Sequence, residues 1–216
     1  MSDEDRRRWD RKYEQARAAE TLQADQWLVD AIQDIPPGRS LELACGLGEN
    51  AVWLATRGWQ VDAVDVSVHG LAVASQLADR HGVTPRLIAA DLDRFLPLPG
   101  AYDLVVVFRF LDRDRLPGLI TRGLAPGGLL VYETFGPGQC DRHDNHLKNP
   151  DFVLAPEELP SLYDELETIR YEEVELPDRS VGRLLARRPV TGSAILHPDA
   201  STAYSPSRPQ IDSRAR

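Results

Sequence analysis

The chain has 216 residues, which gives room for one sizeable hydrophobic core with segments left over at its ends. Apolar residues make up 42% and charged residues 27%, as in an ordinary globular protein, and the formal net charge of -9 argues against a general nucleic-acid binder, which needs a basic face. Two cysteines are too few for a disulfide framework or a thiolate-only metal site, and we find no secretory leader or membrane-spanning run, so we expect a cytoplasmic protein without a membrane partner.

The N-terminal region is predicted to form a helix from residue 5 to residue 34, because apolar side chains recur at helical intervals until Pro36-Pro37-Gly38 ends the pattern. Trp9 and Tyr13 share one face of this helix. They either fold over a bound ligand as a lid or pack on the outside of the core. We therefore treat residues 1–38 as a helical lid and both aromatics as candidate substrate contacts.

A strand, a glycine turn and a helix are predicted to follow one another from residue 39 to residue 57. Apolar residues alternate around Glu42, which suits a short strand, and Gly46 and Gly48 then permit a sharp turn into a helix. The start of such a helix presents backbone N–H groups and a partial positive charge. This stretch therefore indicates a nucleotide-type site.

Two ligand classes fit this turn. The segment from Gly46 to Ala51 satisfies the relaxed dinucleotide pattern G-x-G-x-x-G/A, so an NAD-binding site is one interpretation of this turn. Glu42 favours the other class, because an acid there repels a diphosphate but receives the ammonium of a ligand that carries an amino acid. The alternative for Glu42 is a structural one, in which it caps a loop N–H group.

The second strand is predicted from Trp59 to Asp65 and also ends in an acid. Asp65 lies some twenty residues beyond the glycine turn, where a carboxylate in a Rossmann-type unit accepts hydrogen bonds from both ribose hydroxyls. An adenosine-containing ligand follows for either class. Asp62, on the same strand, is interpreted as a solvated neighbour.

The third strand, residues 85–90, is predicted to follow a helix that Ser67 caps and that runs to Arg80. It ends at Asp91 and Leu92. In a βαβαβ arrangement this strand end lies beside the second, so Asp91 can accept the adenine amino group and Leu92 can offer a backbone N–H group and an apolar contact. The structural alternative for Asp91 is the capping of a turn.

The fourth strand is predicted over residues 101–108 as a near-continuous apolar run, typical of a central parallel strand covered on both faces. Ligands of such sheets lie beyond the carboxyl ends of the strands, so Phe108 and Arg109 should line the floor of the site. Arg109 could hold an anionic substrate. Its alternative role is a structural ion pair with Asp112 or Glu133.

A helix over residues 114–123 and a turn over 124–128 are predicted to lead into a fifth strand, residues 129–135. The long loop that follows, 136–150, contains His143 and His146 and is the expected substrate lid. The two histidines lack a third ligand, so we predict no metal site.

The C-terminal part is predicted to contain a helix over 156–166 and an antiparallel hairpin of strands 168–175 and 180–187. A dinucleotide dehydrogenase domain would not be expected to finish with such a hairpin. Residues 191–216 have no periodicity and are rich in Ser, Pro, Arg, Asp and Ala, so we predict a disordered tail.

Together these segments resemble the class I S-adenosylmethionine-dependent methyltransferases, over a domain placed at residues 39–190. Trp9-Asp-Arg-Lys-Tyr13 is similar to the small-molecule branch related to tellurite-resistance and thiopurine-type methyltransferases. The third glycine of longer motif variants is replaced here by Glu49 and Asn50. The matching segments are Glu42-Leu-Ala-Cys-Gly46-Leu-Gly48, Asp65, Asp91-Leu92, Tyr102-Asp-Leu-Val and Leu124-Ala-Pro-Gly-Gly128.

The resemblance implies an α/β, Rossmann-like, doubly wound sheet of seven strands with the last strand antiparallel. It also implies S-adenosylmethionine as cofactor, with Glu42, Gly46 and Gly48 around its methionine part and a main-chain carbonyl of Phe108 or Arg109 near its ammonium. Asp65 and Val66 would then bind the ribose, and Asp91 with Leu92 the adenine.

The resulting hypothesis is a methyltransferase that acts on a thiol, a chalcogen oxyanion or a related small metabolite, as a monomer or homodimer. Arg109 and the 136–150 loop, with Trp9, Tyr13, His143 and His146 as candidate contacts, would meet the acceptor. No catalytic side chain is assigned, because transfer to a soft or anionic nucleophile mainly requires alignment. An NAD-dependent oxidoreductase and a non-catalytic S-adenosylmethionine-binding protein are the alternatives.

Overall fold

The structure, a computed structural model, describes residues 3–143, 147 and 149–190. The predicted tail at 191–216 and the predicted contact His146 lie outside the described residues. No helix in the described part of the chain is both long and apolar enough to cross a membrane.

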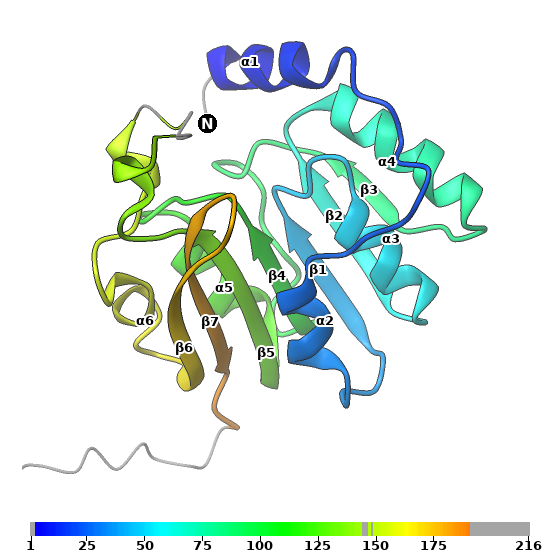
Figure 1. The fold of residues 1–216 in the computed structure, drawn as a ribbon. Coiled ribbons are helices and arrows are strands. Elements are labelled where there is room, and N and C mark those ends of the chain that lie inside the picture. Colours follow the sequence, from blue (N-terminus) through cyan, green and yellow to red (C-terminus); the bar gives the residue numbers. More distant parts are fainter. Residues whose placement is uncertain (1–2, 144–146, 148, 191–216) are drawn as a thin grey trace, which may run out of the picture.

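A seven-stranded sheet forms the centre of the molecule, in the order β3-β2-β1-β4-β5-β7-β6 (Figure 1). Strands β1 to β5 pair in parallel, and β7 is antiparallel to both of its neighbours, β5 and β6. The predicted fold class is thereby confirmed. The strands are β1 (Arg39–Leu43), β2 (Gln60–Asp65), β3 (Arg86–Ala89), β4 (Tyr102–Phe108), β5 (Leu124–Phe135), β6 (Glu167–Glu175) and β7 (Ser180–Arg187).

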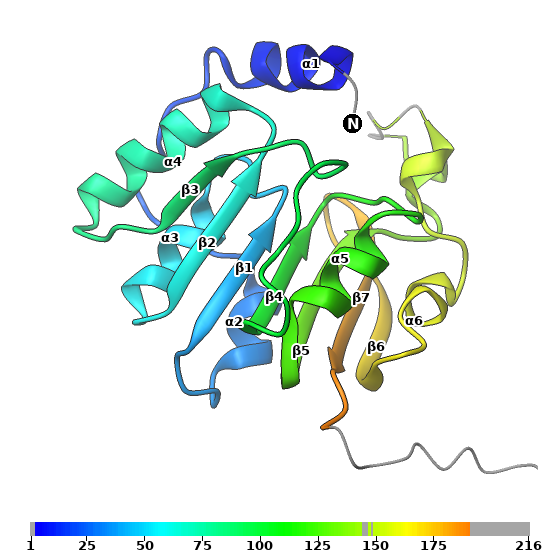
Figure 2. The ribbon, with the colours of Figure 1, turned by 180° about the vertical axis from the view of Figure 1, so that it is seen from behind.

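Helices cover both faces of the sheet, and one helix lies across the carboxyl ends of its strands (Figures 1 and 2). One face carries α2 (Gln26–Ile32), α3 (Glu49–Thr56) and α4 (Val68–Arg80), and the other carries α5 (Leu116–Gly123) and α6 (Glu158–Leu162). Helix α1 (Asp3–Tyr13) lies across the carboxyl ends of the parallel strands. Two short 3-10 helices, η1 (Gln139–Asp141) and η2 (Pro150–Phe152), follow β5 at the same end.

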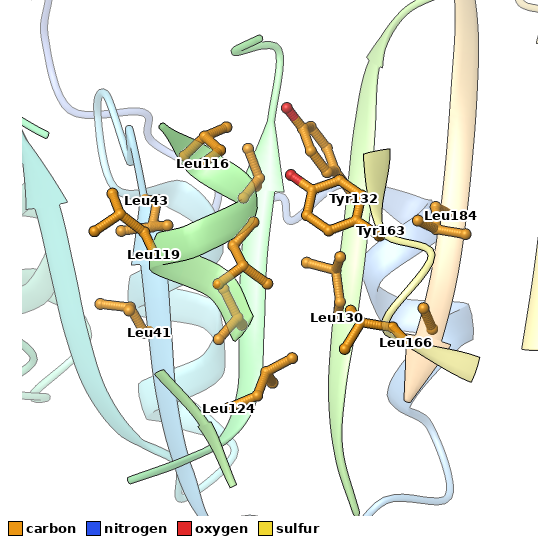
Figure 3. Packing of buried hydrophobic residues seen from close by; sticks show 14 of the residues in the cluster. Leu41, Leu43, Leu116, Leu119, Leu124, Leu130, Tyr132, Tyr163, Leu166 and Leu184 are labelled. Carbon is orange, nitrogen blue, oxygen red and sulfur yellow. The ribbon is translucent and has the colours of Figure 1, made fainter. Parts of the chain in front are cut away.

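The core is divided between the two faces by the alternation of side chains along each strand. On β4, Val105 and Val107 join the cluster beneath α5 and α6, whereas Leu104 and Val106 join the cluster beneath α2 and α3. Figure 3 shows the first cluster, in which the leucines of β1 lie beside those of α5 and the rings of Tyr132 and Tyr163 meet edge to face.

The predicted N-terminal helix is wrong in its middle, because residues 14–25 are not helical. This segment runs over α3 and α4, where Ala18 is buried in a cluster with Val52 and Leu77. Arg80 donates hydrogen bonds to the carbonyls of Ala18 and Ala19, at 3.0 and 3.1 Å. The segment's backbone is thus satisfied by a tertiary partner instead of by helical hydrogen bonds.

Two further boundaries differ from the predictions. Strand β5 begins at Leu124, because Leu124 already pairs with Tyr102 before a register shift. Helix α6 is limited to Glu158–Leu162, preceded by Glu157 with a left-handed φ of 56°. The hairpin of β6 and β7 and the Ser67 cap of α4 are confirmed, since the Ser67 hydroxyl accepts a hydrogen bond from Gly70 N–H at 3.2 Å.

Asp62 is not a solvated neighbour, as the sequence suggested, but a buried partner with 5% exposure. Its Oδ2 accepts hydrogen bonds from Arg39 at 2.9 Å, from Arg86 at 2.7 Å and from the Tyr102 hydroxyl at 2.8 Å. A buried charge must be paired and hydrogen-bonded to be tolerated. Asp62 therefore ties β1, β3 and β4 to β2.

Candidate functional site

The glycine turn between β1 and α3 is the most constrained backbone of the site. Ala44, Gly46 and Gly48 have φ values of 56°, 55° and 76°, in the left-handed region that glycine adopts at little cost. The start of α4 packs directly on the turn, since a Cβ added to Gly70 would lie 2.7 Å from the Gly46 carbonyl oxygen. The turn is therefore fixed against α4.

Glu42 lies buried beside this turn, with 3% exposure, on the sheet face that α2 and α3 cover. Burial raises its pKa to about 8, and the nearby carboxylates of Asp25 and Asp65 act in the same direction against hydrogen bonds from Asn50 and the Ala51 backbone. Its Oε2 atom has no hydrogen-bond partner within the described part of the chain. Such a group favours a cationic ligand.

Asp65 and Val66 end β2 next to the same turn. Asp65 is 7% exposed, and its two carboxylate oxygens accept hydrogen bonds from Gly46 N–H at 2.7 Å and Ser67 N–H at 2.8 Å. Burial raises the pKa of Asp65. Each carboxylate oxygen can accept a second hydrogen bond, so the acid can hold the turn and still receive a ligand hydroxyl.

Asp91 and Leu92 lie at the neighbouring strand end, as the topology predicted, because Ala90 N–H donates to the Asp65 carbonyl at 3.0 Å. The Asp91 Oδ1 accepts a hydrogen bond from Asp93 N–H at 2.9 Å, which is the turn-capping alternative. The Leu92 side chain is buried in the core at 1% exposure. The structure therefore brings both strand-end acids to one edge and gives Asp91 a structural role there.

Helix α1 lies over the turn. The Tyr13 hydroxyl oxygen is 3.1 Å from the position of a Cβ on Gly46, and the Tyr13 ring stacks on Trp9 with a centroid distance of 5.6 Å. Asp10 fastens the helix to α4, because its carboxylate accepts a hydrogen bond from the Ser67 hydroxyl at 2.7 Å and lies 3.2 Å from His69 Nδ1. Burial and the charge of Asp65 raise the pKa of Tyr13. Tyr13 thus covers the turn, and Trp9 stacks on Tyr13.

Arg109 stands at the carboxyl end of β4 with a left-handed φ of 54°. Its guanidinium forms an ion pair with Asp25, and its side chain is 44% exposed. The expected partners Asp112 and Glu133 were wrong: the Asp112 carboxylate accepts from Asp114 N–H at 3.0 Å and Arg115 N–H at 2.7 Å, at the start of α5. Phe108 is buried in the core at 7% exposure.

Glu133 of β5 is occupied by β7 instead. It is 1% exposed, and its two carboxylate oxygens lie 2.8 Å from Arg183 Nε and 3.3 Å from Arg179 Nη2. These arginines come from the antiparallel strand beside β5 and the turn before it. Glu133 is therefore neutralised by Arg183 and Arg179 and does not form the expected ion pair with Arg109.

Asp25, which the sequence did not single out, links the glycine turn to Arg109. Its backbone N–H donates to Asn50 Oδ1 at 2.9 Å, and Asn50 Nδ2 donates to Asp25 Oδ2 at 3.2 Å. Asn50 also hydrogen-bonds Glu42. No local signal marked Asp25, because it lies in a segment whose apolar spacing predicted a continuous helix.

The loop after β5 lies on the β6–β7 hairpin. Gln139, 1% exposed, accepts a hydrogen bond from Ser180 N–H at 2.8 Å, and Arg142 donates to the carbonyls of Leu176 at 3.2 Å and Pro177 at 2.7 Å. His143 is exposed and lines a cavity of about 650 Å³ between this loop and the hairpin. None of its lining residues belongs to the glycine turn, the strand-end acids or α1, so this cavity is separate from the turn.

Metal ligands do not gather in this region. Across residues 3–143, 147 and 149–190, no three side chains of His, Cys, Asp or Glu form a group that could hold a metal ion. The site instead combines a fixed N–H-rich turn, a buried acid with an unpaired oxygen, two strand-end acids and an aromatic cover. This combination suits a nucleoside ligand that carries a cationic group.

Comparison with known proteins gives a family match. Residues 41–128 match the family model described as a methyltransferase domain. The chain is 38% identical over 103 residues to ribosomal RNA small subunit methyltransferase C of Alcanivorax borkumensis, a match that covers 44% of this chain and 31% of that protein. It is 26% identical over 150 residues to the probable S-adenosyl-L-methionine-dependent methyltransferase TehB of Haemophilus influenzae, covering 68% of this chain and 52% of that protein.

Solved structures share the fold. The crystal structure of TehB from Haemophilus influenzae aligns with a TM-score of 0.61 at 23% identity, over 78% of this chain and 63% of that one. A structure described by the conversion of a disulfide bond into a thioacetal group during echinomycin biosynthesis aligns with a TM-score of 0.70 at 18% identity, over 87% and 93%. The chain spans only 31% to 52% of the length of the two curated relatives named above.

Proposed function

We propose that this chain, which belongs to the class I S-adenosylmethionine-dependent methyltransferase family, transfers a methyl group from S-adenosylmethionine to a small molecule. The observation that carries the proposal is the buried Glu42 carboxyl beside the glycine turn, with its unpaired Oε2. An ammonium group would stabilise the ionised form of this carboxyl and pair with its Oε2, whereas a pyrophosphate offers no positive charge to pair with it. The NAD-dependent oxidoreductase alternative is therefore disfavoured.

The residues around the turn fit the parts of this cofactor. We propose that Glu42, Gly46 and Gly48 bind the methionine part, with a main-chain carbonyl of Phe108 or Arg109 beside its ammonium. Asp65, with Val66, would accept the ribose hydroxyls, since its oxygens keep acceptor capacity beyond the two backbone bonds. Asp91 and Leu92 would bind the adenine.

The chain's own contribution to the reaction would be alignment and the exclusion of water. When bound, S-adenosylmethionine supplies an electrophilic methyl group on a sulfonium sulfur. Tyr13 covers the turn with Trp9 stacked on it, and Arg109 lies at the strand end where the acceptor would enter. We assign no catalytic side chain, because a soft or anionic acceptor needs mainly to be held in line.

The proposed acceptor is a thiol, a chalcogen oxyanion or a related small metabolite. Two observations support this class over a nucleic acid: the net charge of -9, and α1 lying across the strand ends, which narrows the approach to the turn. The hairpin cavity with His143 is displaced from the turn and is a weaker candidate for acceptor binding. We propose a monomer or homodimer that acts without a metal.

Calorimetric titration with S-adenosylmethionine, S-adenosylhomocysteine and NAD, side by side, tests the proposal. Micromolar binding of the first two is expected, and Asp65→Ala should weaken it by about 1–3 kcal/mol, because a buried partner is left unpaired. Binding of NAD alone would replace the proposal with the oxidoreductase alternative. Tight binding with no labelled-methyl transfer across a broad acceptor panel would indicate a non-catalytic sensor.

A further inference from the structure

Two cations of α1 lie beside the aromatic rings of Trp9 and Tyr13. Lys12 of α1 lies with its Nζ 4.3 Å from the ring centroid of Trp9 and 5.9 Å from that of Tyr13. Arg8, one turn earlier, lies 5.6 Å from the Trp9 centroid and 5.9 Å from the centroid of Phe152 in η2. The aromatic rings therefore hold these two side chains on the α1 face that looks toward the strand ends.

Lys12 differs from its two cationic neighbours in having no carboxylate partner among the described residues. Burial lowers its pKa, and the nearby positive charges of Arg8 and Arg109 lower it further. Arg8 pairs at 3.7 Å with Asp5 and Arg109 pairs with Asp25, but Lys12 forms no ion pair with any carboxylate that the structure describes. An ammonium that has no carboxylate partner and lies near two further cations favours an anion there.

The position of these cations assigns the anion to the acceptor. Tyr13 contacts the glycine turn and α4, on the β1 and β2 side, where the proposed cofactor residues lie. Arg109 ends β4, and Arg8 reaches Phe152 in the segment that follows β5. Arg8 and Arg109 both lie near enough to lower the pKa of Lys12, and Arg8 shares the Trp9 ring with it, so Lys12 belongs to the β4 and β5 side of the strand ends.

We propose that Lys12 and Arg109 form an anion subsite for the methyl acceptor, so that the enzyme selects small acceptors that carry a carboxylate or an oxyanion. The inference rests on the proposed function and narrows its substrate class. Lys12 acts as a specificity residue: it holds the anionic group while the rings of Trp9 and Tyr13 keep its ammonium over the site.

A pair of thiols that differ only in charge tests this. Mercaptopropionate and mercaptopropanol are titrated calorimetrically into the protein saturated with S-adenosylhomocysteine, for the wild type, Lys12→Met and the control Arg11→Met. Arg11, like Lys12, is an exposed cation on α1, so both variants remove one charge from the same helix. Methionine keeps an unbranched side chain on the rings, so α1 should stay in place.

We expect the wild type and Arg11→Met to bind the carboxylate about tenfold more tightly than the alcohol, and Lys12→Met to lose this preference. Raising the salt concentration should shrink the preference, because exposed charges are screened. Equal binding of the two thiols, no binding of the carboxylate, or an equal loss in Arg11→Met would overturn the inference alone. Absence of S-adenosylhomocysteine binding in the same cell would instead show that the proposed function is wrong.

Discussion

Replacing Glu42 by glutamine removes a buried carboxyl group whose pKa burial raises far above its usual range. In the folded protein that pKa is raised from 4.5 to about 8, chiefly by burial. A group with a raised folded pKa contributes stability below its unfolded pKa and loses it as the pH rises through the folded pKa. Between these two values the unfolded chain ionises Glu42 while the folded protein keeps it protonated, so the native state loses stability as the pH rises.

The magnitude follows from the linkage relation. Neutral pH lies about 2.5 units above the pKa of Glu42 in the unfolded chain and below its pKa in the folded protein. Each pH unit in this range corresponds to about 1.36 kcal/mol of stability. Ionisable Glu42 therefore costs the wild type about 3 kcal/mol there. Glutamine keeps the shape and the contact with Asn50 but cannot ionise, so Glu42→Gln should be the more stable protein at neutral pH.

Urea unfolding followed by tryptophan fluorescence, at a series of pH values from about 5 to about 8, measures this difference. The free energy of unfolding of the wild type should fall by about 3 kcal/mol relative to that of Glu42→Gln across the series. Glu167→Gln, at the exposed first residue of β6, is the matched control, and its free energy of unfolding should depend on pH as that of the wild type does. Parallel curves for wild type and Glu42→Gln would refute the burial argument.

Further expectations concern the cofactor and the fold. If the cofactor ammonium pairs with Glu42, binding at neutral pH should release about one proton, measured by calorimetry in buffers of different ionisation enthalpy, and none in Glu42→Gln; zero release by the wild type would contradict the pairing. Asp62→Ala should lower the free energy of unfolding by about 3 kcal/mol, because Arg39 and Arg86 lose a buried partner. An unchanged midpoint of urea unfolding would show that solvent screens the two arginines. Asp10→Ala should raise hydrogen exchange in residues 3–13 and weaken cofactor binding severalfold while changing the global stability by less than about 1 kcal/mol. Unaltered exchange in α1 would mean that Asp10 does not hold the helix.

The order of the elements and their roles could be predicted where the signal is local. Alternation around Glu42 and the glycines after it predicted β1 and its turn, because side-chain period and backbone freedom are properties of adjacent residues. The acids Asp65 and Asp91 could be placed at one edge, since parallel strands carry their carboxyl ends to the same side. The hairpin of β6 and β7 followed from two apolar runs with a short connection.

The electrostatic partners could not be predicted in this way. Arg109 pairs with Asp25 across 84 residues, and Asp62 meets Tyr102 across 40, so no spacing along the chain could reveal either pair. The non-helical segment 14–25 could not be predicted either. Its apolar spacing indicated a helix, but Arg80, distant in the chain, donates hydrogen bonds to the carbonyls of Ala18 and Ala19.

The sequence by itself determined the sheet, the glycine turn and the strand-end acids, because each depends on residues that are neighbours in the chain or on the fixed direction of parallel strands. Only the tertiary structure decided which charges are neutralised and which remain available. Packing sets the distance between side chains from distant segments and removes the water that would otherwise screen them. That is why Asp62 became a structural anchor, and why Lys12 was left among cations at the edge of the site.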